Sequence, residues 1–270
     1  MRFSVLLVLA ATLTAGCAAS SDEAGSSEAA LASPEAAAII GGEVETGYPA
    51  VGMLRFRSGS FGTGSLITPE WVLTAAHVAL GNPTTFFYGT PGAGKDPVPD
   101  NLKSAETDRI EIHPCYPRTG YKVPASCPKD AVDVALVHLK APITDVAPLP
   151  ILNGPLELLW GLISPYEGDR CVAVGFGAWL DASNKVSFGT RRSAKSIIKS
   201  IGDDELQTVR DTGIASSGDS GGPLLCDGKI IATVRGSAGT IPSTSPYDRS
   251  VEGYERTDRR RDWITTTVQN

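Results

Sequence analysis

Short apolar or alternating segments recur along most of the chain, and turns containing glycine and proline separate them. Segments of this length and spacing predict β-strands. The first set comprises 51–57, 65–68, 71–75, 84–88, 109–113 and 133–139, and the second comprises 171–176, 190–201, 205–211, 223–226, 230–236 and 252–257. A proline-containing connection at 142–153 separates the sets, and 258–268 has the pattern of an amphipathic helix. The pattern predicts a mostly β chain that ends in one helix.

The sequence before residue 39 has a different character. Arg2 precedes an apolar stretch at 3–13 and small residues follow, which predicts an export signal over 1–16. The residues before Cys17 also fit a bacterial lipobox, in which this cysteine becomes lipidated; the alternative is an ordinary signal peptide with a chance cysteine. Residues 17–38 are mostly Ala, Ser and Glu, which predicts a flexible tether or propeptide.

The cysteine count bears on this choice. The chain has five cysteines, so one is left over when four of them pair, and this favours lipidation of Cys17. We therefore expect an exported protein of a bacterium, either secreted or lipid-anchored in the cell envelope, where disulfides form.

Composition and charge narrow the possible functions. The chain has 270 residues, of which 41% are hydrophobic, enough for a sizeable core. A net charge of -6 does not suggest a nucleic-acid partner. The sequence contains neither a Cys-x-x-Cys pair nor paired histidines, so a zinc site is not indicated. We expect a monomer without metal or organic cofactor.

The strongest candidate for chemistry is Ser220, in the pentapeptide GDSGG at 218–222. A serine hydroxyl is a poor nucleophile until a nearby base takes its proton. All three histidines precede Ser220, which argues against an α/β-hydrolase esterase because the histidine of that fold follows its serine. The subtilisin order requires an aspartate before His77, and Asp22 in the leader is the only one. The remaining layout of a serine hydrolase has the order His, Asp, Ser, and His77, Asp133 and Ser220 meet it. His77 ends one apolar segment and Asp133 begins another.

Several motifs together resemble the chymotrypsin/trypsin family of serine proteases. They are TAAH ending at His77, DVAL from Asp133, GDSGGP around Ser220, IIGG at 39–42, CVAVGFG from Cys171, and Tyr254 followed by Trp263 and Ile264. The resemblance runs from residue 39 to about 264. It implies an all-β fold of two six-stranded antiparallel barrels with a C-terminal helix. One barrel would span 39–145 and carry His77 and Asp133, and the other, with the helix, would span 146–270 and carry Ser220.

The resemblance implies a serine endopeptidase that hydrolyses peptide bonds of proteins or peptides through an acyl-enzyme intermediate. Ser220 would attack the carbonyl carbon, His77 would act as general base and Asp133 would orient the imidazole ring. Backbone N–H groups of Gly218 and Ser220 would bind the oxyanion. The alternative is a catalytically silent binding protein on the same fold.

The resemblance also implies activation by proteolysis. Cleavage after Ala38 by an activating protease would free the α-amine of Ile39, which would pair with buried Asp219 and order the loop around Gly218. The alternative is that 39–42 is only a buried strand and turn.

The family resemblance assigns one disulfide, between Cys171 and Cys226. Cys115 and Cys127 could close a local loop before Asp133. Gly62 and Val78 stand where the family has a cysteine pair beside the catalytic histidine. Likewise, Ser216 and Thr240 stand where it has a disulfide at the specificity pocket.

The specificity pocket is where the chain departs from the family. Ile214 stands at the pocket base in place of the aspartate of trypsin-like enzymes, which argues against a simple preference for Arg or Lys. Glu252 aligns with a glycine on the far wall: it could fill the pocket, receive a basic side chain, or belong to a misaligned loop. Ser237 would line the pocket wall. Arg235 replaces a serine that faces the catalytic aspartate, and either a cation near Asp133, a slip by one residue or a reoriented side chain would account for it.

Overall fold

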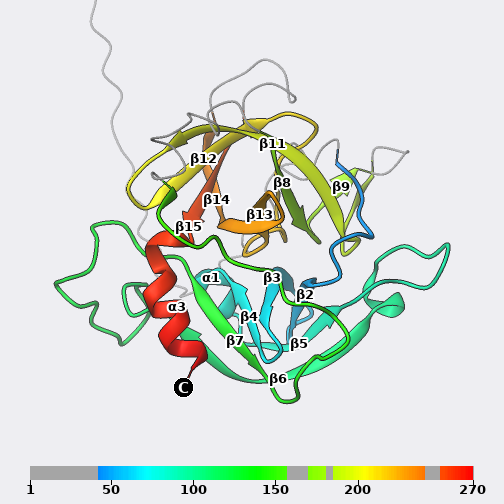
Figure 1. The fold of residues 1–270 in the computed structure, drawn as a ribbon, viewed down its shortest axis with the longest axis horizontal. Coiled ribbons are helices and arrows are strands. Elements are labelled where there is room, and N and C mark those ends of the chain that lie inside the picture. The colour runs from blue at the N-terminus through cyan, green and yellow to red at the C-terminus, as the bar shows by residue number, and fades with distance from the viewer. Residues whose placement is uncertain (1–41, 157–169, 181–184, 241–249, 270) are drawn as a thin grey trace, which may run out of the picture. The chain divides into compact units, whose positions relative to one another are not determined.

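The computed structural model describes residues 42–156, 170–180, 185–240 and 250–269. Cys17 and Ile39 lie outside these residues, and so does the whole leader. The described part contains two closed β-barrels and a C-terminal helix, labelled in Figure 1. This arrangement confirms the expected fold of two six-stranded antiparallel barrels.

The first barrel is closed in the order β2-β3-β4-β7-β6-β5. Its strands are β2 (Val51–Phe56), β3 (Phe61–Thr68), β4 (Trp71–Thr74), β5 (Pro83–Tyr88), β6 (Lys103–Ile112) and β7 (Ala135–Leu139). Leu54, Leu66, Val72, Phe86 and Val137 are buried in its interior. Side chains at alternate positions of a strand face the same side, so the alternating sequence places these apolar groups inside.

The second barrel has the order β11-β12-β15-β14-β13-β8, and it closes because β11 also pairs with β8. Its strands are β8 (Arg170–Gly175), β11 (Arg192–Ile201), β12 (Glu205–Arg210), β13 (Pro223–Cys226), β14 (Lys229–Thr240) and β15 (Ser250–Arg256). A short strand, β1 (Glu43–Val44), adds to the edge of β11. Tyr254, Leu206 and Leu224 are buried in the core of this barrel.

The C-terminal segment packs across both barrels. A 3₁₀ turn, η3 (Asp258–Arg260), leads into helix α3 (Arg261–Val268). Ile264 of α3 is buried in a cluster with Leu136 of the first barrel and Leu225 of the second. The helix therefore buries its apolar face against the junction of the two barrels.

Both expected disulfides are present. One joins Cys115 to Cys127 across a separation of 12 residues. The other joins Cys171 of β8 to Cys226 of β13. They leave Cys17 as the unpaired cysteine of the sequence, and its fate stays a prediction.

The bounds of several strands and helices differ from those that the sequence predicts. β6 begins at Lys103, six residues before the expected start, because its exposed charged side chains hide the strand pattern. The final helix begins at Arg261, since 258–260 form the 3₁₀ turn. A short helix, α1 (Ala76–Ala79), and a hairpin of β9 (Trp179–Leu180) with β10 (Val186–Ser187) were not expected, because both are shorter than a detectable sequence period.

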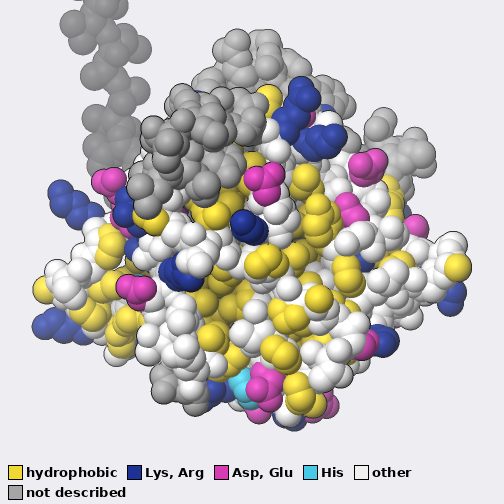
Figure 2. Space-filling view, viewed as in Figure 1, with side chains coloured by type: hydrophobic (Ala, Val, Ile, Leu, Met, Phe, Trp, Pro, Cys, Tyr) yellow, Lys and Arg dark blue, Asp and Glu magenta, His cyan; other side chains and the backbone are white. Residues whose placement is uncertain are grey.

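Charged side chains of both signs are interspersed with apolar ones on the face shown in Figure 2, and no continuous basic surface is visible among its described residues. Within the described ranges, no helix is both long and apolar enough to cross a membrane.

Candidate active site

His77 and Asp133 lie side by side because of the strand order of the first barrel. β4 and β7 are antiparallel neighbours with Thr74 opposite Ala135. The residues that follow β4 therefore lie next to those that precede β7. His77 is the second residue of α1, directly after β4, and Asp133 comes two residues before β7 begins.

Both carboxylate oxygens of Asp133 bind His77. The ring atom Nδ1 lies 2.7 Å from Oδ2, and the backbone N–H of His77 donates to Oδ1 at 2.9 Å. An ionised carboxylate only accepts hydrogen bonds, so Nδ1 carries the proton and Nε2 of the neutral ring is left as an acceptor. Asp133 is only 4% exposed, whereas 36% of the His77 side chain is exposed. The pair thus presents a basic nitrogen held in one orientation.

Ser220 lies in a loop of the second barrel that the first barrel holds through Thr63 of β3. The N–H of Thr63 donates to Ser220 O at 2.9 Å, and its hydroxyl donates to Gly218 O at 2.8 Å. The same hydroxyl accepts from Phe176 N at 3.1 Å, and Thr74 Oγ1 donates to Thr63 O at 2.7 Å. Sequence reasoning missed Thr63, because only the contact between the barrels reveals its role.

Gly221 brings this loop against the end of β4. A Cβ at Gly221 would lie 2.1 Å from Thr74 Oγ1 and 2.7 Å from Ala75 N, and its φ of +80° is in the region that favours glycine. Residue 221 therefore touches the strand end that leads into His77. Within the described residues, Ser220 Oγ forms no hydrogen bond, including none to His77. Such bonds are often long without a substrate and tighten when one binds.

The peptide groups before Gly218 and Ser220 are fixed through their carbonyl oxygens. Ser217 O accepts from Ala178 N at 2.9 Å, and Asp219 O accepts from Gly222 N at 2.8 Å. The N–H groups on the other side of these peptides, those of Gly218 and Ser220, donate to no atom in the described part of the chain. Two fixed donors without acceptors beside a serine form a suitable site for a developing oxyanion.

Asp219 is a buried carboxylate that only neutral donors satisfy among the described residues. It is 1% exposed, and it accepts from Gly177 N at 2.7 Å, Ser216 N at 2.8 Å and Ser216 Oγ at 3.3 Å. Burial raises the pKa of Asp219 to about 7. Its expected partner, the amine of Ile39, lies outside the described residues.

Two of the predicted specificity residues are buried, Ile214 in the loop before Ser220 and Glu252 in β15. Ile214 and Glu252 are each 5% exposed. Glu252 occupies a regular position of β15, opposite Thr208 of β12 and Ser237 of β14, so it belongs to a strand and not to a loop. Burial, and to a smaller extent the charge of Asp219, raise the pKa of Glu252 to about 8. At neutral pH this carboxyl group is therefore mostly protonated.

The side chain of Arg235 is directed toward two glutamates. Its Nη1 atom lies 3.6 Å from Glu205 Oε2 and 3.9 Å from Glu255 Oε2. Glu255 in turn accepts the backbone N–H of Asp133 at 3.1 Å. β14 has a register shift between Val234 and Gly236, and the guanidinium contacts Glu205 and Glu255, so of the three explanations the structure favours a reoriented side chain.

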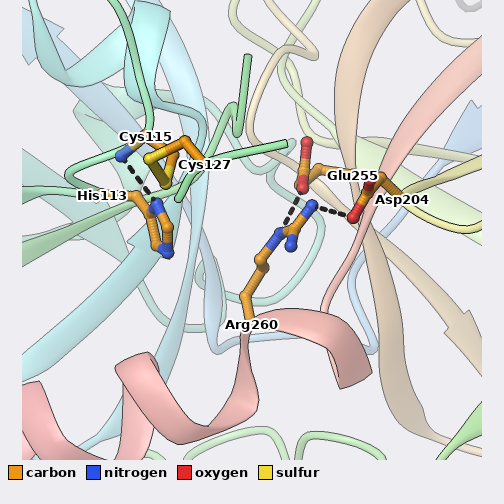
Figure 3. Close-up of a disulfide and its surroundings, with 6 residues drawn as sticks. All are labelled: His113, Cys115, Cys127, Asp204, Glu255 and Arg260. Atoms are coloured by element: carbon orange, nitrogen blue, oxygen red, sulfur yellow. Dashed lines mark hydrogen bonds and ion pairs between the residues drawn. A yellow bond between two sulfur atoms is a disulfide. The ribbon is translucent and has the colours of Figure 1, made fainter. Parts of the chain in front are cut away.

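Gly62 and Val78 are the two positions at which the chain lacks the cysteine pair beside His77. A Cβ on Gly62 would lie 2.6 Å from Val78 Cγ1, so the two positions without cysteines do face each other. His113 Nδ1 accepts the N–H of Cys115 at 3.1 Å, and burial with the charge of Arg260 lowers the pKa of His113 to about 4 (Figure 3). His138 Nδ1, on β7, lies 2.7 Å from Asp108 Oδ1. Within the described ranges, no group of three or more His, Cys, Asp or Glu side chains is placed to hold a metal ion.

Comparisons with known proteins agree with this geometry. The model of the family described as Trypsin matches residues 39–264. Snake venom serine protease KN5 of Trimeresurus stejnegeri is 27% identical over 78% of each chain. Kallikrein 1-related peptidase b21 of Mus musculus is 29% identical over 76% of this chain and 79% of its own.

Among solved structures, neuropsin, a serine protease expressed in the limbic system of mouse brain, has the same fold. The TM-score is 0.62 at 22% sequence identity, with 85% of this chain and 99% of neuropsin covered. These relatives are animal proteins, so they give no support to the expected bacterial origin.

The raised pKa of the buried Glu252 leads to a prediction for how the free energy of unfolding depends on pH. Its pKa rises from an ordinary 4.5 to about 8 on folding. Between these values the native state keeps a proton that the unfolded chain has released, so the free energy of unfolding falls as pH rises. Glu252→Gln should leave stability nearly unchanged at pH 4.5 and raise it by up to about 4 kcal/mol at pH 8.5.

Urea unfolding at both pH values measures this difference. Glu70→Gln, at an exposed position, is the matched control and should show no such pH dependence. An equal effect of Glu252→Gln at both pH values would contradict the assignment.

Proposed function

The chain belongs to the trypsin family of serine proteases, and on that premise we propose that it is an active serine endopeptidase with His77, Asp133 and Ser220 as its catalytic residues. The family acts on protein or peptide substrates. The observation that carries the proposal is the pairing of both Asp133 oxygens with His77, on a strand end that the Ser220 loop touches.

The proposed reaction follows from these positions. Nε2 of His77 accepts the proton of Ser220 Oγ as the oxygen attacks the substrate carbonyl carbon. The carbonyl oxygen becomes an oxyanion that the N–H groups of Gly218 and Ser220 bind. The imidazolium, stabilised by Asp133, returns the proton to the leaving amine, and water later releases the acyl group by the same route. The chain supplies each of these groups.

The alternative, a silent binding protein, has less support. A binding surface needs neither a basic nitrogen held by a buried aspartate nor two fixed N–H donors without acceptors. Each of these features costs stability and is useful for catalysis. We therefore favour catalysis.

We propose that the chain is exported through residues 1–16 and activated by cleavage before Ile39. Buried Asp219 supports the second step, because an interior carboxylate surrounded by neutral donors is a favourable place for a new α-ammonium group. Lipidation of Cys17 and a bacterial origin stay predictions from the sequence.

The catalytic assignment is tested with the processed protein and a fluorophosphonate probe. The probe should label Ser220 with one equivalent, because only an activated serine reacts. Ser220→Ala should abolish labelling and lower peptide hydrolysis by at least about 10⁴-fold. A correctly folded, processed protein that neither reacts nor hydrolyses peptides would favour the binding protein instead.

The activation step is tested with precursor in which the bond after Ala38 is intact. We expect its kcat/KM to be about 10² lower than that of the cleaved protein, since an unformed oxyanion site loses at least one donor. Asp219→Asn should remain at the low level after cleavage, and Asp100→Asn, at an exposed position, should not. Full activity of the intact precursor would refute this mechanism.

Substrate preference should change with pH because of Glu252. We propose that the pocket formed with Ile214 prefers an aliphatic residue before the cleaved bond while Glu252 is protonated. A lysine or arginine there should gain once Glu252 is ionised. The ratio of kcat/KM for lysine over leucine substrates should therefore rise about tenfold between pH 6.5 and 9 and stay flat in Glu252→Gln. A wild-type ratio independent of pH would exclude this role.

A further inference from the structure

A cluster of charged residues beside the backbone of Asp133 joins β14, β15 and the start of β12 to the 3₁₀ turn η3. Glu255 of β15 is 1% exposed and accepts Arg260 Nε of η3 through Oε1 at 2.7 Å. Arg260 also pairs with Asp204, which precedes β12 (Figure 3). Through its other oxygen, Glu255 accepts the N–H of Asp133 and approaches Arg235 of β14. The cluster thus ends on the backbone of a proposed catalytic residue.

Burying these charges requires a physical reason. An ion pair in the interior often contributes less stability than apolar residues of the same size. Burial raises the pKa of Glu255, and the contacts with Arg260, the Asp133 N–H and Arg235 act against this rise. A chain under selection for stability alone would do as well with an apolar residue here. A role for the charge itself accounts for the cost.

The position of Arg235 explains why a negative charge on Glu255 is useful. Glu255 Oε2 lies 3.9 Å from Arg235 Nη1 and 3.1 Å from the backbone N of Asp133. One carboxylate oxygen therefore links the guanidinium to the backbone of Asp133. The charges of Arg235 and Asp133 also act on the same hydroxyl, that of Tyr116. A cation at this position favours the neutral imidazole of His77 over the imidazolium that catalysis requires. Glu255 places a negative charge beside the cation and offsets this effect.

We propose that Glu255 and Arg235 are positioning residues that together set the basicity of His77, with Glu255 holding the backbone of Asp133 and countering the charge of Arg235. This inference rests on the proposed function for its meaning in catalysis. The ionisable groups that surround the His77–Asp133 pair and the cluster are Tyr116 and His113 after β6, Asp204 and Glu205 at β12, Arg235 of β14, Glu255 of β15 and Arg260 of η3.

The two single charge changes should act in opposite directions. Glu255→Gln removes an anion, so the imidazolium becomes less stable and the pKa of His77 should fall. Arg235→Gln removes a cation, so the pKa of His77 should rise. Because the charges act through a partly buried site, each shift should be about 0.5 to 1 pH unit. The double variant should lie between the two single variants.

Two measurements on the processed enzyme test this. The first is the acid limb of the pH profile of kcat/KM, which reports the free-enzyme base. The second is the NMR titration of the His77 ring proton, assigned by its loss in His77→Gln, which requires no catalysis. Lys199→Gln and Glu70→Gln make the same charge changes at exposed positions, and should leave both midpoints within about 0.2 units.

The outcomes separate the two proposals. Opposite shifts in both measurements support the inference. The inference is overturned if the titration midpoints of Glu255→Gln and Arg235→Gln equal those of wild type, or if both variants shift them in the same direction. If wild type hydrolyses no peptide but the NMR midpoints shift as expected, the proposed function fails and the control of His77 basicity stands. If Glu255→Gln does not fold, Arg235→Gln, whose side chain is 24% exposed, decides the question alone.

Discussion

The contact between Thr63 and the Ser220 loop is the constraint on which the proposed site depends. His77 and Asp133 come from one barrel and Ser220 from the other, so the relative placement of the barrels sets the geometry between base and nucleophile. Thr63 binds the carbonyl groups of Gly218 and Ser220 directly, and Thr74 fixes Thr63 in turn. Net hydrogen-bond energies of about 1 kcal/mol each are modest, but a buried group left without its partner costs more. The interface therefore resists small displacements.

These hydrogen bonds lie where the family has covalent links and this chain has none. The Gly62–Val78 contact adjoins Thr63, and Ser216 beside Asp219 replaces the first cysteine of a pocket disulfide. The Ser216 hydroxyl lies 3.1 Å from Ala178 O and 3.3 Å from Asp219 Oδ2. Hydroxyl groups thus hold the loop at two points where a disulfide is missing. The two disulfides that remain, Cys115–Cys127 and Cys171–Cys226, lie elsewhere.

The features that depend on local sequence pattern or on family motifs could be predicted from the sequence. It predicted twelve barrel strands, the two cysteine pairs and the proximity of His77 to Asp133. It could not predict Thr63 or Glu255, because their roles depend on the register between strands that are distant in sequence. Arg235 remained ambiguous for the same reason, since no local pattern shows which carboxylates a long side chain will reach. The length of β6 was underestimated because both of its faces carry polar residues.

Four buried carboxylates around the site are stabilised in different ways, and this difference indicates their roles. Asp133 binds an imidazole, and Glu255 binds two arginines and a backbone N–H. Asp219 accepts only neutral donors among the described residues, and Glu252 accepts no hydrogen bond from them. A carboxylate whose charge is already balanced serves best as a permanent anion. A buried acid without a cation favours the binding of one, so Asp219 and Glu252 are the groups that an α-amine or a basic substrate would stabilise.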